Sequence, residues 1–192
     1  MSRSGAVVGV SDHGGWAILV TVAGDATVLE RRRVELVDPA LPALPHHHEG
    51  QALPLDQALD LVERVRASAE HHAALALDAV ATAMPSKITG IALRERPPLP
   101  PTVAERLRDY RSRNVADWVM YRTALADAAQ ARGWTVHWYD ARTVLDAARG
   151  ALEGTDLDAC FAQVRASLGP PWTRDHKLAM AAAMLAGRAG RL

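Results

Sequence analysis

Arginine side chains gather around one tyrosine in the middle of the sequence. A guanidinium group binds phosphate through two parallel hydrogen bonds, and a tyrosine ring can stack on a base. The segment 94–113 has a net charge of +3, with six Arg against Glu95, Glu105 and Asp109. This composition predicts a nucleic-acid-binding surface, although a solvated helix face of mixed charge would have the same composition. The candidate residues for this surface are Arg106, Arg108, Tyr110, Arg111 and Arg113.

Three consecutive histidines and a glutamate, His46 to Glu49, lie in a segment rich in proline. Imidazole and carboxylate are ligands that suit Zn²⁺ or Ni²⁺. Adjacent residues in a loop rarely converge on one ion, however, so a polar loop is the simpler interpretation.

Aromatic residues with polar atoms are concentrated beyond residue 110. Spacings of three and four place the group from Asn114 to Arg122 on neighbouring turns of a helix, and four more aromatics follow along the chain. Trp and Tyr are common at protein interfaces. This Trp/Tyr-rich C-terminal half is therefore expected to form either a partner or homo-oligomer surface or, equally well, a core with hydrogen-bonded Trp. The residues concerned are Asn114, Asp117, Trp118, Tyr121, Arg122, Trp134, Trp138, Tyr139 and Trp172.

The bulk properties favour one ordinary globular domain over residues 1–192. The formal net charge is zero, which argues against nucleic-acid binding by bulk charge. The one cysteine, Cys160, excludes an intramolecular disulfide and a cysteine-rich zinc site. The first residues lack a long apolar run, and no segment reaches the ~20 apolar residues of a membrane span. We expect a cytoplasmic protein without a membrane partner, and the abundance of Ala and Arg suggests a bacterium with a GC-rich genome.

Three strands are predicted first, over residues 6–11, 16–22 and 27–37. The first two are apolar on both faces, as in strands covered on both sides of a sheet, and Asp12-His13-Gly14-Gly15 is turn chemistry. The third carries Glu30, three arginines and Glu35, and charges of this kind suit a solvated edge strand.

Helices and strands then alternate. Apolar spacing predicts a helix from Leu55, with a continuation or second helix over 73–83. Thr102 and Glu105 form a capping box, and the helix they begin is expected to break near 112–114 and restart at Asn114. Tight turns make the first three strands antiparallel, and intervening helices make the later strands parallel. The remaining predicted elements are strands 88–93 and 134–139, helices over 141–168 with a break near 150–154, and a last helix over 174–187 capped by Thr173.

This order resembles the ribonuclease H-like fold, which includes crossover-junction resolvases. The resemblance covers about residues 6–187 and implies an α/β domain with a five-stranded mixed sheet, three antiparallel strands coming first and alternating helices and parallel strands after them. It also implies a nuclease that acts on structured nucleic acid with Mg²⁺ or Mn²⁺. Two such ions activate a water and stabilise the leaving oxygen of a phosphodiester.

The resemblance also implies where the metal-binding carboxylates should lie. These positions are the first strand, the end of the fourth strand and the last helix, and the matching residues are Asp12, Glu95 and Asp175. His176, or His13, would orient a water or act as a base.

One position departs from the family pattern. Resolvase-like strands read Gly-Ile-Asp, but this sequence has Gly9-Val10-Ser11, and Asp12 follows one residue later. Because successive strand residues point to opposite faces, Asp12 could point away from the other acids. Arg94 and Arg96 also flank Glu95 as possible ion-pair partners. The alternative function is therefore a non-catalytic binding or protein-interaction domain on the same fold.

Overall fold

The computed structural model describes residues 5–151 and 156–189, in which one mixed sheet has the strand order β3-β2-β1-β4-β5. The first three strands pair antiparallel, whereas β4 is parallel to β1 and β5 is parallel to β4. This arrangement confirms the predicted α/β sheet and its strand directions. The strands are β1 (Ala6–Asp12), β2 (Trp16–Val22), β3 (Val28–Glu35), β4 (Ile88–Arg94) and β5 (Thr135–Tyr139).

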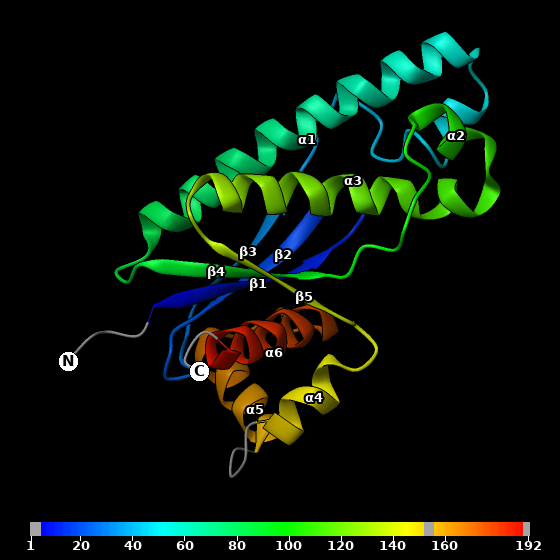
Figure 1. Cartoon of the computed structure of the whole chain (residues 1–192). Coiled ribbons are helices and arrows are strands. Elements are labelled where there is room, and N and C mark those ends of the chain that lie inside the picture. Colours follow the sequence, from blue (N-terminus) through cyan, green and yellow to red (C-terminus); the bar gives the residue numbers. More distant parts are fainter. Residues whose placement is uncertain (1–4, 152–155, 190–192) are drawn as a thin grey trace.

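Helices cover both faces of the sheet (Figure 1). The long helices α1 and α3 lie on one face, and α4, α5 and α6 lie on the other. Within residues 5–151 and 156–189, no helix is long and apolar enough to cross a membrane. The helices are α1 (Leu55–Ala83), α2 (Val103–Arg108), α3 (Tyr110–Ala131), α4 (Val144–Ala151), α5 (Leu157–Leu168) and α6 (Arg174–Ala189), with a short 3₁₀ helix at Glu49–Gln51.

The sheet has a separate hydrophobic core on each face, because its central strands are apolar on both sides. Val8 and Val10 of β1 pack on the side of α1 and α3, and Val7 packs on the side of α6. All three are buried, and burial of a valine side chain contributes roughly 1.5–3 kcal/mol. The alternation along β1 also decides the direction of the polar residues at its end.

Some helix boundaries differ from the sequence prediction. Residues 55–83 form one continuous helix, and the break before α3 falls at Asp109, whose side chain accepts a hydrogen bond from the Ser112 backbone N–H. Asp109, not Asn114, is therefore the N-cap, because the chain already turns at the end of α2. The capping box of Thr102 and Glu105 is confirmed. The predicted break near 150–154 falls between α4 and α5, where residues 152–155 lie outside the described part.

The charges of β3 lie at one edge of the sheet, as predicted. Arg31 donates hydrogen bonds to the carbonyl groups of residues 168–171. These bonds hold the C-terminal end of α5 and the segment after it against β3. Arg32 pairs with Glu30, and the Arg33 guanidinium lies 3.8 Å from the centre of the Trp16 ring. The three arginines thus bind groups of the protein itself.

Candidate ionic site at the ends of β1 and β4

Ser11 and Asp12, the last two residues of β1, bind partners on opposite faces of the sheet. The Ser11 hydroxyl donates a hydrogen bond of 2.7 Å to Asp175 Oδ1 of α6. The Asp12 carboxylate accepts a hydrogen bond of 2.8 Å from Arg122 Nε of α3. Side chains alternate between the two faces of a strand, so Ser11 faces α6 and Asp12 faces α3, as the sequence register indicated.

Close packing of α6 on β1 brings Asp175 to Ser11. A Cβ atom at Gly9 would overlap the carbonyl group of Ala179, so the absence of a side chain lets the helix backbone approach the strand. Ser11 follows Gly9 by two residues on the same face of the strand, and Asp175 precedes Ala179 by one helical turn. The Gly9 contact therefore fixes the position of the Ser11–Asp175 pair.

Arg94, the last residue of β4, joins the groups at this corner. Its Nη2 atom donates to Ser11 Oγ at 2.5 Å and lies 3.5 Å from Asp175 Oδ1. Its Nη1 atom donates to the Asp12 carbonyl oxygen at 3.1 Å, and its Nε lies 3.8 Å from Asp12 Oδ1. One guanidinium group therefore contacts the residues that β1 and α6 contribute.

Arg122 supplies the second cation. The Asp12 side chain is fully buried beside it, and Arg122 Nη1 also donates to the carbonyl oxygen of Glu95 at 2.7 Å. Two guanidinium groups thus face two carboxylates, and the formal charge of Asp12, Asp175, Arg94 and Arg122 sums to zero. Burial of a carboxylate without such partners would cost several kcal/mol.

The environment of Asp175 favours its ionised form. Partial burial alone would raise the pKa of this carboxyl group, but the hydrogen bond from Ser11 and the electrostatic interactions with His13 and Arg94 lower it below its ordinary value. His13 Nε2 lies 3.2 Å from Asp175 Oδ1. The His13 ring is also stacked on Trp16, with 3.9 Å between the ring centres.

Glu95 and His176, two predicted site residues, have other surroundings. The Glu95 side chain is exposed, and Arg94 and Arg96 do not form the expected ion pairs with it, since Arg94 turns to Ser11 and Arg96 donates to Thr123. The His176 ring is buried, and its Nδ1 accepts a hydrogen bond from the Thr173 N–H. Burial, with the positive charge of Arg31, lowers the pKa of His176. Through the hydrogen bond from Thr173, His176 thus stabilises the first turn of α6.

The chemistry of these donors does not fit a two-metal centre. Hard divalent cations require several carboxylate oxygens at one point, whereas Asp12 and Asp175 are each engaged by arginine or serine, and Glu95 lies on the surface. Among residues 5–151 and 156–189, no group of three or more His, Cys, Asp or Glu side chains is arranged to hold a metal ion. Glu95, the acid that the resemblance matched to the end of the fourth strand, directly follows Arg94, and it is Arg94 whose side chain contacts Ser11 and Asp175.

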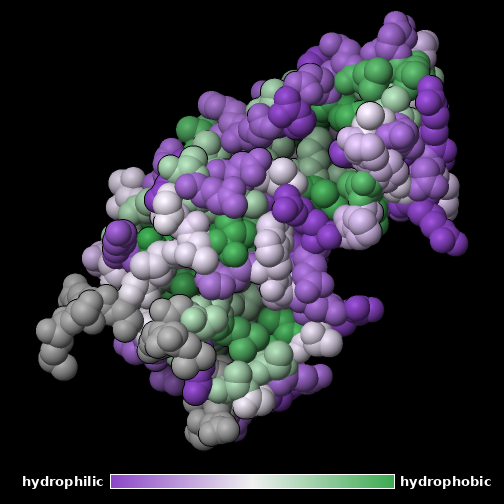
Figure 2. Space-filling view, viewed as in Figure 1, coloured by the Kyte–Doolittle hydropathy of each residue, from purple (hydrophilic) through white to green (hydrophobic). Residues whose placement is uncertain are grey.

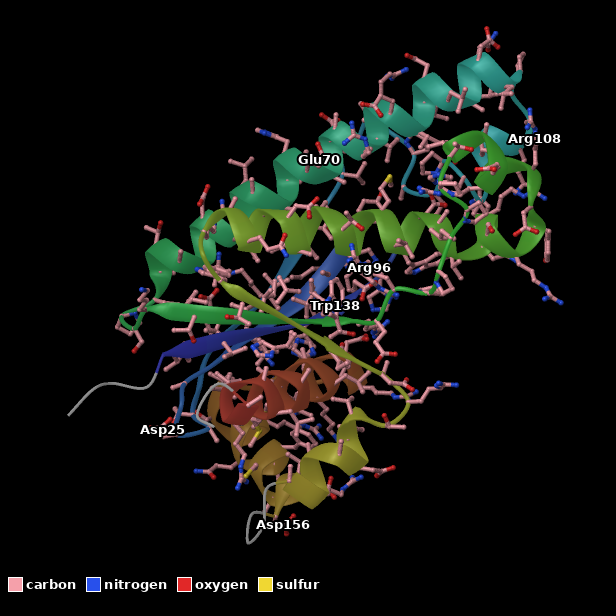
Figure 3. The ribbon with its side chains drawn as sticks, viewed as in Figure 1. Asp25, Glu70, Arg96, Arg108, Trp138 and Asp156 are labelled. Atoms are coloured by element: carbon pink, nitrogen blue, oxygen red, sulfur yellow. The ribbon has the colours of Figure 1, made fainter. Side chains whose placement is uncertain are left out.

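The predicted nucleic-acid-binding residues lie where α2 meets α3. Arg108, Tyr110 and Arg111 are exposed, and 69 % of the Tyr110 surface is accessible. The Arg113 guanidinium lies 5.9 Å from the centre of the Tyr110 ring. Arg106 instead donates to the carbonyl oxygens of residues 100 and 101, so it fixes the proline segment. Arg108 projects from the outer tip of α2 (Figure 3), and the outline of the molecule is hollowed between this part and the part formed by α4 and α6 (Figure 2).

The histidine loop is held by two buried residues of α3, Asp117 and Tyr121. The Asp117 carboxylate accepts hydrogen bonds from the backbone N–H groups of His46 and His47, and it lies 2.7 Å from His46 Nδ1. One turn later, the Tyr121 hydroxyl donates to the Ala43 carbonyl oxygen. Asp117 and Tyr121 are therefore hydrogen-bonded residues of the core, and they anchor the loop on α3.

Comparisons with known proteins identify the fold. No protein-family model matches the sequence, and no curated protein does. A solved structure of Thermus thermophilus RuvC in complex with a Holliday junction substrate is similar, with 17 % identity, a TM-score of 0.51 and coverage of 97 % of this chain and 95 % of that chain. A further T. thermophilus RuvC structure has 16 % identity, a TM-score of 0.49 and coverage of 97 % and 96 %. At this identity the similarity concerns the fold, and the chain has the ribonuclease H-like fold that its element order predicted.

Proposed function

We propose that this chain is a non-catalytic ribonuclease H-like domain that binds structured nucleic acid. One observation carries the proposal: at the ends of β1 and β4, the guanidinium groups of Arg94 and Arg122 neutralise the carboxylates of Asp12 and Asp175. A divalent cation would have to compete with Arg122 and Arg94 for Asp12 and with Arg94 and Ser11 for Asp175, and Ser11 offers only a neutral hydroxyl.

The nuclease hypothesis is less well supported by this geometry. Hydrolysis by two metal ions requires carboxylates that converge on both ions. Of the three predicted acids, Asp12 faces α3, Asp175 faces Ser11, and Glu95 has an exposed side chain. We therefore favour binding over cleavage.

Nucleic-acid binding is supported by the surface at the junction of α2 and α3. Arg108 and Arg111 are exposed there beside Tyr110, and guanidinium groups near an accessible aromatic ring suit contacts to phosphate and base. The similar RuvC structure was solved in complex with a Holliday junction substrate, which suggests a branched DNA as the first ligand to test.

Fluorescence anisotropy with a labelled four-way junction, a duplex and a single strand tests this proposal in Mg²⁺-containing buffer. We expect binding of the intact junction without cleavage, and affinity that falls as the salt concentration rises. Arg108→Glu with Arg111→Glu should weaken binding at least about tenfold, since each lost phosphate contact is largely electrostatic.

The matched control is Arg64→Glu with Arg165→Glu, which makes the same charge change at two other exposed arginines. It should weaken binding much less. Equal losses in the two double variants would indicate bulk charge and contradict the assigned surface, and cleavage of the junction in Mg²⁺ would contradict the non-catalytic proposal.

A further inference from the structure

The two edge strands of the sheet differ in charge. At one edge, β3 carries five charged residues, Glu30 to Arg33 and Glu35. At the other edge, β5 has the sequence Thr-Val-His-Trp-Tyr and contains no Asp, Glu, Lys or Arg. Charged side chains protect an edge strand against pairing with another strand. The protein therefore protects β3 in this way and leaves β5 without such protection.

The outer side of β5 presents backbone hydrogen-bonding groups. The Tyr139 carbonyl group points inwards, because it accepts a hydrogen bond of 2.9 Å from the N–H of Glu95. Alternation along the strand then turns the N–H and C=O groups of Val136 and Trp138 outwards. In the described ranges no other strand pairs with this side, and Figure 1 shows β5 in front of the sheet with no helix drawn across it.

Trp138 adds an apolar surface next to this edge. Its side chain is 38 % exposed, and the Arg96 guanidinium lies 4.4 Å from its ring centre. Arg96 is in turn fixed by its hydrogen bond to Thr123. Figure 3 shows Arg96 and Trp138 next to each other in front of the sheet. Exposed tryptophan is enriched at protein interfaces relative to other surfaces.

We propose that β5 pairs antiparallel with β5 of a second copy of this chain, across a two-fold axis at His137. In that register Val136 of one copy faces Trp138 of the other, so the outward backbone groups of both copies form hydrogen bonds. A neutral strand pairs with itself without charge repulsion. The charged β3 edge opposes head-to-tail growth between β3 and β5, so the contact closes as a dimer and does not extend into a filament.

The proposed contact is small, because only five residues form β5. An interface below the standard size of about 1,600 Å² is expected to give a dimer that dissociates on dilution. The proposal does not depend on nucleic-acid binding, so each can fail without the other.

Cysteine cross-linking tests the register directly, in a Cys160→Ser background that removes the native thiol. The two-fold axis would place the two copies of residue 137 in a pair that is not hydrogen-bonded, with Cα atoms about 4.5 Å apart. This separation lies within the range of disulfides. We expect His137→Cys to form a covalent dimer under mild oxidation. Thr135→Cys, which would face Tyr139 of the other copy, is the matched control and should stay monomeric.

Sedimentation velocity over a range of protein concentrations provides the second measurement. We expect a monomer–dimer equilibrium that Trp138→Lys weakens at least about tenfold, since the added charge lies at the paired edge. Leu75→Lys makes the same kind of change at a leucine of α1 that is 53 % exposed, and it should have no effect. A monomer at all concentrations, equal cross-linking at positions 135 and 137, or binding of β5 only to other proteins would overturn the proposal.

Discussion

Arg122 Nε lies 2.8 Å from Asp12 Oδ2, and this carboxylate is completely buried. The pair joins α3 to the end of β1 across the face of the sheet. It also gives Asp12 a structural role, whereas the family resemblance implied a metal-binding role.

Loss of Arg122 should strongly destabilise the fold. Arg122→Met leaves a buried carboxylate with only the more distant Arg94 as a counter-ion, and breaking a buried pair typically costs about 3–5 kcal/mol. Urea unfolding followed by circular dichroism measures the change. The double variant Asp12→Leu with Arg122→Met should recover part of the loss, because apolar replacement of both partners removes the uncompensated charge.

The control for this prediction is Arg142→Met. Arg142 also forms an ion pair with an aspartate, Asp140, but its side chain is 89 % exposed. Exposed ion pairs contribute little to stability, so this variant should unfold like the wild type. An Arg122→Met protein as stable as the wild type would show that the Asp12 contact is unimportant.

Replacing the hydroxyl and the guanidinium group at the end of β1 and β4 should create divalent-metal binding. Ser11→Asp with Arg94→Glu surrounds Asp175 with two further carboxylates and removes the cation that contacts it. Carboxylate oxygens are the preferred ligands of Mg²⁺ and Mn²⁺. Calorimetric titration with Mn²⁺ should show binding to this double variant.

Ser11→Asn with Arg94→Gln is the matched control, because it changes the same positions without adding carboxylates, and it should not bind Mn²⁺. A Ser11→Asp, Arg94→Glu protein that is folded by circular dichroism and yet binds no Mn²⁺ would show that Arg94 is not what prevents metal binding.

The turn after β1 depends on its contact with the loop that follows β3. Gly15 has a φ of +82°, and a Cβ atom there would lie 2.9 Å from the Ala43 side chain and 3.1 Å from that of Val37. Gly133 has a similar φ of +72° with no atom near its Cβ position. Both Gly→Ala changes should cost roughly 1–2 kcal/mol for the left-handed backbone, and Gly15→Ala should cost more because of the close contacts.

The difference in unfolding free energy between the two Gly→Ala variants measures the packing of Gly15 against Ala43 and Val37. The cost of the left-handed backbone is nearly the same in both variants, so it cancels. Thermal unfolding monitored for both proteins provides the comparison. If Gly133→Ala is destabilised as much as Gly15→Ala, the loop around Ala43 contributes nothing to the turn.

Asp175 should make stability depend on pH in the acid range. Its pKa is lowered in the folded state, so its contribution is fully present above the ordinary aspartate pKa of about 3.9 and is lost as pH falls through the lower folded-state value. Asp175→Asn should therefore be less stable than the wild type at pH 7, and the two proteins should converge in acid. Urea unfolding at pH 7 and below pH 4 measures this gap, which should be absent for the exposed Asp146→Asn.

The order of the elements along the chain, the strand directions and the edge position of the third strand could be predicted from the sequence, because their signals are local. Apolar runs, the Asp12 to Gly15 turn and the charged third strand each indicate a position in the sheet without long-range information. The sequence predicts that the helix restarts at Asn114, whereas α3 begins after Asp109. Both residues can cap a helix, and only the path of the chain after α2 decides between them.

The ionic site was harder to predict, because its partners are far apart in the chain. The Gly9-Val10-Ser11 register already indicated that Ser11 and Asp12 face opposite ways. The sequence could not indicate that Arg94 turns towards Ser11 and away from its neighbour Glu95, or that Arg122 reaches across the sheet. These contacts depend on how closely α6 and α3 approach β1, and the Gly9–Ala179 contact becomes visible only in three dimensions.

Calorimetric titration of the wild-type protein with Mg²⁺ and Mn²⁺ tests the central claim most directly, with Asp12→Asn titrated in parallel. If Arg94 and Arg122 neutralise the buried and half-buried carboxylates, the wild type should bind neither ion at millimolar concentration, and Asp12→Asn should behave in the same way. Binding of Mn²⁺ to the wild type that is lost in Asp12→Asn would contradict the claim and support a metal-dependent nuclease.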